Sequence, residues 1–173
     1  IDATTAGVQG LAISTGSGAV GLTVVGDTTA LDFLTVTTSG TTTLAGDIAT
    51  VNAIDMSAAT GGITITANRI IDSTAGSIDL SGSNIAPTTV DTETLTVGGA
   101  TTTGVRLAGI GQTGAVGSVT VNSLNGATLT GNITTDNDVT VTGDTVVAAA
   151  NITIATGGVA GNDITLATIN DDA

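Results

Sequence analysis

The chain has 173 residues and a formal net charge of −13, with 15 acidic side chains against two Arg, and it contains neither His nor Cys. Lys is absent as well, so the composition excludes Ser-His-Asp triads, thiolate nucleophiles, disulfides, the usual zinc sites and Schiff-base chemistry. The negative charge argues against nucleic acids and anionic membrane surfaces as partners, because proteins bind both through Lys and Arg.

The aliphatic content indicates a chain that folds. Leu, Ile and Val contribute 44 residues, about a quarter of the sequence, which is above the level of about 20 % at which disorder is expected. The longest unbroken apolar run, Val146–Ala150, is far shorter than the roughly 20 residues that cross a bilayer. We therefore expect a soluble protein that does not insert into membranes.

The predicted elements are short strands along the whole chain. Two aliphatic residues separated by one other residue share one face of a strand, and such pairs recur in order at Leu11/Ile13, Val20/Leu22, Leu34/Val36, Ile54/Met56, Ile63/Ile65 and Ile78/Leu80. Gly, Asn, Asp and Ser lie between the pairs and favour turns. No segment has sustained helical spacing, so the sequence predicts an all-β fold.

The strand pattern of the first half of the chain recurs in the second half. Ile1, Ile85 and Ile169 are equally spaced, and further matches join Leu11–Ile13 to Leu95–Val97, Val20–Leu22 to Val105–Leu107, Leu34–Val36 to Val119–Val121, Ile54–Met56 to Val139–Val141 and, after an insertion, Ile63–Ile65 to Ile152–Ile154. The chain thus divides into repeat 1 (residues 1–84), repeat 2 (residues 85–168) and residues 169–173, which begin a further repeat or form a terminal tail.

Two architectures fit these repeats. A parallel β-helix, or β-solenoid, needs about four rungs of about 21 residues per repeat, hence about eight rungs in all. It predicts stacked columns of inward side chains, namely Leu22, Leu44 and Ile65, and Ile13, Val36, Met56 and Leu80. The alternative is two tandem Ig-like β-sandwiches, one per repeat, although such domains often carry core aromatic residues and Phe33 is the only aromatic residue here.

Segments such as Gly131–Gly143 and Asn151–Gly158 resemble the β-strand repeats of large secreted bacterial proteins, the filamentous-haemagglutinin-like exoproteins and adhesins. The resemblance covers nearly the whole chain, but its motifs are compositional. It implies a right-handed β-helix outside the cell that serves as a stalk, filament or adhesive fibre.

Calcium is the only cofactor that the acidic residues suggest. The candidate ligands are Asp136 and Asp138, followed by Asp171 and Asp172 near the end of the chain. Most acidic positions do not recur between the repeats, however, which favours a solvated turn surface over a built-in metal site. The acids also lack an aromatic sugar platform, so we predict no catalytic residues and no enzyme activity.

Threonine provides the other repeated signal. The chain has 38 Thr, and several recur between repeats, including Thr35/Thr120, Thr43/Thr128 and Thr64/Thr153. High β propensity on a soluble outer face accounts for them. Thr-x-Thr ladders on a solenoid also resemble those of ice-binding proteins, but the Thr-x-Thr motifs here are irregularly spaced, so ice binding is a minor alternative.

Together these patterns predict a non-enzymatic structural protein, extracellular or on the surface of a bacterial or archaeal cell. The expected partner is the protein itself, because the bare end of a solenoid exposes unpaired backbone groups and an apolar cross-section that another copy or a further repeat can cover. A cell-surface or matrix receptor is a second possible partner. Under the Ig-like alternative, the two repeats are spacer domains of a surface adhesin.

Overall fold

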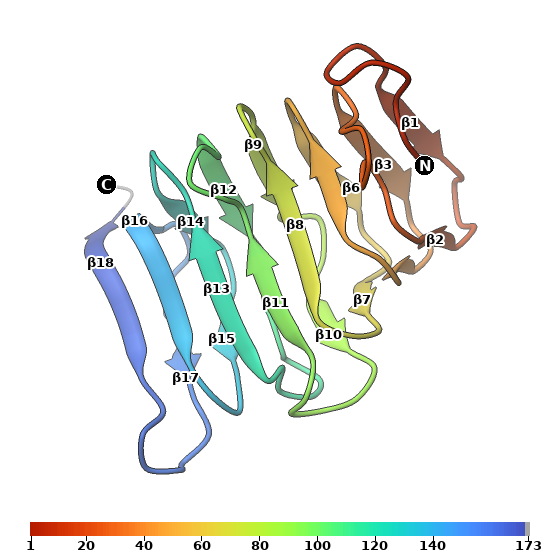
Figure 1. Ribbon diagram of the computed structural model, residues 1–173. Helices are drawn as coiled ribbons and strands as arrows, with labels where there is room; N and C mark the ends of the chain where they lie inside the picture. The colour runs from red at the N-terminus through yellow and green to blue at the C-terminus, as the bar shows by residue number, and fades with distance from the viewer. Residues whose placement is uncertain (172–173) are drawn as a thin grey trace.

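The computed structural model describes residues 1–171 and is a β-solenoid of about seven turns. Figure 1 shows the chain advancing along one axis, so that strands of neighbouring turns lie side by side from the N-terminal to the C-terminal end. All strand pairs are parallel. The described residues form no helix, and hence no helix that could cross a membrane. The fold is therefore a coil with three faces, which the chain visits in a fixed order.

The first face carries eight strand segments, one from each passage of the chain. They are β1 (Leu11–Ser14), β3 (Leu34–Thr38), β6 (Ile54–Ala59), β9 (Ser77–Leu80), β12 (Gly104–Leu107), β14 (Ala127–Leu129), the second half of β16 (Val139–Val147) and the second half of β18 (Ile164–Asp171).

The second face follows in the chain. It consists of β2 (Val20–Leu22), β4 (Thr42–Leu44), β7 (Ile63–Ile65), β10 (Ile85–Pro87), the bridge residue Ile110, β15 (Ile133–Thr134) and β17 (Ile154–Ala155). The third face consists of Val25, β5 (Ile48–Thr50), β8 (Arg69–Ser73), β11 (Thr94–Val97), β13 (Ser118–Asn122) and the first halves of β16 and β18.

Alternation along each strand builds the core. In β7 the burial alternates, so that Ile63 and Ile65 point inward and are fully buried while Thr64 points outward. The same alternation places one aliphatic column on the next, and the inward residues of all three faces form a single apolar core along the axis. Branched aliphatic side chains suit this arrangement, since they pack well on a pleated surface and need little lateral room.

Hydroxyl groups satisfy the backbone where the chain turns between faces. Thr50 Oγ1 donates to Asn52 O at 2.7 Å, and Thr135 Oγ1 donates to Asn137 O at the same distance. Thr102, which is fully buried, donates through Oγ1 to Ser73 O at 2.7 Å and accepts from the Gly99 N–H at 2.9 Å. These bonds account for the three buried Thr at these corners, because a buried carbonyl or N–H needs a partner. Ser123 Oγ, buried at the corner after β13, has no partner among the described residues.

Both predicted columns of inward side chains are confirmed. Leu22 pairs with Leu44 and Leu44 with Ile65, while Ile13 pairs with Val36. Met56 and Leu80 are buried on β6 and β9 of the same face, although the register of β3 with β6 shifts between Thr35 and Thr37, so this column continues there without a direct pair. The all-β solenoid is thus confirmed, with about seven turns where about eight rungs were expected. The Ig-like alternative is wrong, because a sandwich needs antiparallel strand pairs, whereas the strands here are parallel along one continuous core.

The two sequence repeats are related in space by a shift of one face. In repeat 1 the first-face column is Leu11, Leu34, Ile54 and Ile78. The matching residues of repeat 2 are Leu95, Val119, Val139 and Ile164, which form a column on the third face. The second-face residues Val20 and Thr42 likewise correspond to Val105 and Ala127 on the first face. A repeat therefore advances the chain by three turns and two faces, which is one face short of four whole turns.

Corner hydrogen bonds confirm this relation. The Gly26 N–H donates to Ile1 O at 2.7 Å, and the Gly111 N–H, at the matching position of repeat 2, donates to Ile85 O at 2.9 Å. One sequence match is wrong: the residue paired like Ile63 in repeat 2 is Thr145 rather than Ile152, since Thr145 lies between Ala127 and Ile169. Strands of repeat 2 pair with strands of repeat 1 as regularly as strands within a repeat do. The boundary between residues 84 and 85 therefore stays a prediction from the sequence.

Candidate functional site

The C-terminal end of the solenoid exposes inward-facing aliphatic side chains. Ile164 and Ile169 of β18 are 45 % and 62 % exposed, although the residues that they pair with on the previous turn, Val139 and Thr145, are fully buried. Ile152, Ile154 and Leu166 at the same end are half-buried. Among the described residues β18 pairs only with β16, so its outer edge offers free N–H and C=O groups.

The N-terminal end is partly covered. Among the described residues β1 pairs only with β3, and its inward residues Leu11 and Ile13 are half-buried. The segment 1–9 lies against the corner that follows β2, where the Ala3 N–H donates to Thr29 O at 3.1 Å and the Gly26 N–H donates to Ile1 O. The Asp2 carboxylate accepts from the N–H groups of Thr28 and Thr29, and these bonds lower its pKa.

The loop that opens each repeat is closed by one side-chain oxygen. In repeat 1, Gln9 Oε1 accepts from the N–H groups of Thr4 and Thr5 at 3.0 and 3.1 Å. In repeat 2, Glu93 replaces Gln9, and its Oε1 accepts from the Thr89 N–H at 2.7 Å and from Thr88 Oγ1 at 2.9 Å.

Glu93 is itself buried. Burial alone would raise the pKa of its carboxyl, but hydrogen bonds from Thr88, Thr89 and Thr92 outweigh burial and hold the pKa below its usual value. Glu93 is thus accounted for as a carboxylate that closes a loop.

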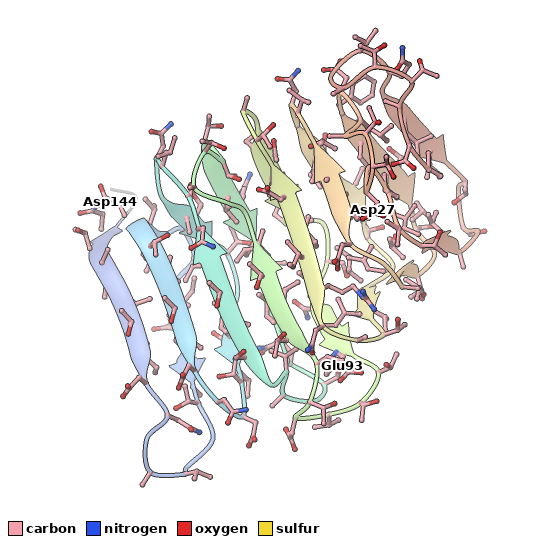
Figure 2. All side chains as sticks on the ribbon, in the orientation of Figure 1. Asp27, Glu93 and Asp144 are labelled. Atoms are coloured by element: carbon pink, nitrogen blue, oxygen red, sulfur yellow. The ribbon has the colours of Figure 1, made fainter. Side chains whose placement is uncertain are left out.

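The acidic side chains are dispersed over the solenoid. Figure 2 shows Asp27, Glu93 and Asp144 at three separate places along its length. Among the acidic side chains that the structure describes, no three come close enough to hold a metal ion together. The one ion pair among these residues joins Arg69 Nη1 to Asp47 Oδ1 at 3.4 Å.

The calcium candidates are split between two regions. Asp136 and Asp138 lie in the loop between β15 and β16, where Asp138 Oδ1 accepts from the Asp163 N–H at 2.9 Å. Asp171 lies in β18 on the first face, where it pairs with Val147. Asp172 lies outside the described residues. Asp136 and Asp138 are therefore neighbours in one loop, whereas Asp171 belongs to another part of the coil, and calcium binding stays a prediction.

The structure aligns threonines that the sequence spacing does not reveal. Thr96, Thr120, Thr140 and Thr165 pair in succession and form one outward column on the third face. Two residues earlier, the outward positions are Thr94 and Ser118, then Asp138 and Asp163. The third face therefore carries a single Thr column beside a mixed one. Thr35 and Thr120, which match between the repeats, lie on different faces.

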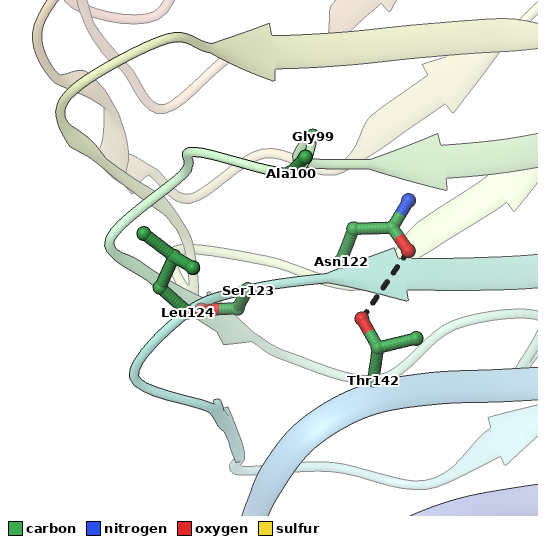
Figure 3. A pocket seen from close by; sticks show the side chains of 6 residues that line it. All are labelled: Gly99, Ala100, Asn122, Ser123, Leu124 and Thr142. Atoms are coloured by element: carbon green, nitrogen blue, oxygen red, sulfur yellow. Dashed lines mark hydrogen bonds between the residues drawn. The ribbon is translucent and has the colours of Figure 1, made fainter.

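An open hollow of about 400 Å³ lies between the corners that follow β11 and β13 (Figure 3). It is lined by Gly99, Ala100, Asn122, Ser123, Leu124 and Thr142, none of them charged, and Thr142 Oγ1 donates to Asn122 Oδ1 at 3.2 Å. The lining contains no acid, base or nucleophile in a catalytic arrangement.

Comparison with known proteins adds no assignment. The chain matches no family model, no curated protein and no solved structure. The ends of the coil are the surfaces at which residues of the core are open to solvent.

Proposed function

We propose that this protein is a structural rod outside the cell, and that further β-solenoid turns continue the rod at its ends. The supporting observation is the open C-terminal turn, where Ile164 and Ile169 are exposed although their partners on the preceding turn, Val139 and Thr145, are fully buried. Covering such side chains removes apolar surface from water, and pairing the free edge satisfies its backbone groups.

The fold itself suits this role. About seven turns spaced by about 4.8 Å make a rod roughly 35 Å long, and each added turn lengthens the rod without changing its cross-section. The outer faces carry mostly Thr, Ser, Asn, Asp and Gly. Dispersed acids and an uncharged hollow support a non-enzymatic role, and the resemblance to secreted bacterial repeats supports a place on a bacterial or archaeal surface.

Electron microscopy and X-ray diffraction of concentrated protein test the proposal. We expect unbranched filaments one solenoid wide, with a reflection at about 4.8 Å along the fibre axis, because the strands run across that axis. A protein that stays a dispersed monomer at high concentration and high salt would contradict the proposal.

Ice binding is the second candidate, favoured by the column of Thr96, Thr120, Thr140 and Thr165. We rank it below the rod because the neighbouring outward column contains Asp138 and Asp163. Thermal hysteresis of a dilute solution tests it: a freezing gap that disappears when Thr140 is replaced by a bulky residue would favour ice binding.

A further inference from the structure

The junction between the two repeats within the chain shows how a repeat seats on the one before it. The first strands of repeat 2 cover the last turn of repeat 1 through three contacts: β10 on β7, β11 on β8 and β12 on β9. Ile110 of repeat 2 then lies on Ile85 of β10. Inward aliphatic residues meet there, such as Val97 with Ile71 and Leu107 with Leu80.

The two ends of the molecule carry the counterparts of these surfaces. By the correspondence between the repeats, β1 and β2 are the equivalents of β11 and β12. At the other end, β17 and Ile164–Leu166 of β18 are the equivalents of the end of β8 and of β9. The N-terminal end thus matches the repeat 2 side of the internal junction, and the C-terminal end matches the repeat 1 side.

We propose that the C-terminal end binds the N-terminal end of a second copy of this chain, rotated by one face relative to the first. This inference rests on the proposed rod function, and it specifies the partner of the rod and the rotation between neighbouring copies. In this setting β1 of the second copy lies on β17, and β2 lies on Ile164–Leu166 of β18. A copy seated without rotation would instead place β1 on the first face, over Ile169–Asp171.

The side chains in the rotated setting are complementary. Inward contacts are aliphatic in every column: Leu11 on Ile152, Ile13 on Ile154, Val20 on Ile164 and Leu22 on Leu166. The internal junction has Arg69 beneath Leu95, where the rotated junction has Ile152 beneath Leu11, so the latter is the more apolar of the two. The outward pairs are Ala12 with Thr153 and Gly21 with Thr165. None of these four residues is charged, whereas the same correspondence places Ala19 opposite Asp163.

The segment Ile1–Ala3 of the incoming copy must move for the two copies to dock. Ile169 in the receiving chain holds the place that Ile1 holds in the incoming copy, because both are equivalent to Ile85. On docking, Ile1–Ala3 of the incoming copy leave their corner. Its Gly26 N–H then bonds to Ile169 O as the Gly111 N–H bonds to Ile85 O at 2.9 Å. The exchange replaces the bond between Gly26 and Ile1 by an equivalent one, and it breaks the bonds that Asp2 and Ala3 make to the corner after β2.

Disulfide trapping tests both the partner and the rotation. Adjacent parallel strands bring paired residues within about 5 Å, which a disulfide can bridge. The double variant A12C/T153C is prepared beside two matched controls for the other settings, A12C/T165C and A12C/N170C. The variant I70C/T96C, whose residues pair within the chain, calibrates the oxidising conditions. All are oxidised in high salt and separated on non-reducing gels.

We expect a ladder of covalent multimers from A12C/T153C at least ten times stronger than from either control. A stronger ladder from A12C/T165C or A12C/N170C would overturn the rotated setting while leaving the rod intact. If I70C/T96C closes and none of the other variants forms multimers, end-to-end stacking is overturned, and the proposed rod assembly with it.

Discussion

At the scale of single residues, the tight corners require glycine at particular positions. Gly26 has a φ of +74°, and a Cβ there would lie 2.1 Å from Ala49 O on the next turn. Gly98 and Gly111 have positive φ and the same 2.1 Å approach, to Asn122 O and Thr134 O. The close spacing of the turns thus depends on glycine at these positions, because any other residue would add a Cβ that clashes with the next turn.

Replacing Gly26 with Ala should therefore destabilise the protein by about 2–3 kcal/mol, through the left-handed backbone and the clash with Ala49 O. Gly21→Ala is the matched control, since an added Cβ on that exposed outward position meets nothing within 4 Å. Urea denaturation measures both variants. An equal stability for the two would contradict the requirement for glycine at the corner.

Buried threonines should respond in opposite ways to the same substitution. Thr42 points inward between Val20 and Ile63, and its Oγ1 has no hydrogen-bond partner within residues 1–171, whereas Thr102 Oγ1 bonds to Ser73 O and Gly99 N. We expect Thr42→Val to stabilise by about 1 kcal/mol and Thr102→Val to destabilise by about 1–2 kcal/mol. Thermal unfolding of the two variants checks the signs, and a loss of stability in both would show that Thr42 has a role in packing.

Glu93 should make stability depend on pH. Its folded pKa is lowered, so its carboxylate stabilises the fold fully above the ordinary Glu pKa of about 4.3, and this contribution is lost as the pH falls through the folded value. We expect Glu93→Gln to be less stable than the natural protein at pH 7 and to approach it below about pH 4.

The equivalent loop of repeat 1 provides the control, because Gln9 closes it with a neutral oxygen. Gln9→Glu should introduce a pH dependence of the same sign, and a smaller one, since Gln9 is exposed. Urea midpoints between pH 3 and 7 measure both effects. A constant gap between Glu93→Gln and the natural protein across this range would rule out the carboxylate as the cause.

At the scale of the elements, in-register pairing stacks outward charges as well as inward aliphatics. Asp55 on β6 pairs with Asp79 on β9, and Asp79 pairs with Arg106 on β12. Each Asp also accepts hydrogen bonds through Oδ1 from the backbone and hydroxyl of a Ser two positions later, Ser57 or Ser81. The two carboxylates thus repel each other while their positions are held by local bonds.

Asp55→Asn should relieve this repulsion and keep the bonds to Ser57, because the Asn side-chain oxygen also accepts hydrogen bonds. We expect a gain of roughly a few tenths of a kcal/mol at low ionic strength that vanishes in about 1 M NaCl, where the screening length is about 3 Å. Denaturation at the two salt concentrations measures it. A gain that persists at the higher concentration would point to a cause other than charge.

At the scale of the whole molecule, a net charge of −13 opposes end-to-end assembly. Salt should therefore promote assembly in a graded way, because it screens repulsion between copies. Mildly acidic pH should act in the same direction by protonating Asp. Light scattering across a NaCl series and a CaCl₂ series measures the response.

Specific calcium binding makes a different prediction for the same experiment. It requires saturable stoichiometric binding and loss of the calcium effect when Asp136 and Asp138 are both replaced by Asn. We expect these replacements to leave the NaCl response in place. Assembly that ignores NaCl and is abolished by a calcium chelator would contradict the screening account.

The shift of one face per repeat also shapes the surface of the rod. Since a repeat ends two faces further on than a whole number of turns, the face that Leu11 and Leu34 line in repeat 1 corresponds to the one that Leu95 and Val119 line in repeat 2. Three consecutive repeats would place the same outward residues on all three faces in turn. A rod built in this way presents no unique side to its neighbours.

The sequence by itself determined the strands and the inward columns. Alternation of aliphatic residues, as in Ile63 and Ile65, decides which side chains face the core, and the absence of His, Cys and Lys removes most catalytic chemistry before any fold is known. The stacking of Leu22, Leu44 and Ile65 was predictable because the chain between them forms turns of nearly constant length.

Only the tertiary structure decided which residues share a face elsewhere. Corner loops vary in length, so that Ala127 pairs with Thr145 after a short turn of the chain, whereas Ile78 pairs with Val105 after a much longer one. Linear spacing therefore does not report stacking, which is why the column from Thr96 to Thr165 and the equivalence of Ile63 with Thr145 were not foreseen. Register in a solenoid is determined by inward packing and corner hydrogen bonds, and these depend on the neighbouring turn rather than on local sequence.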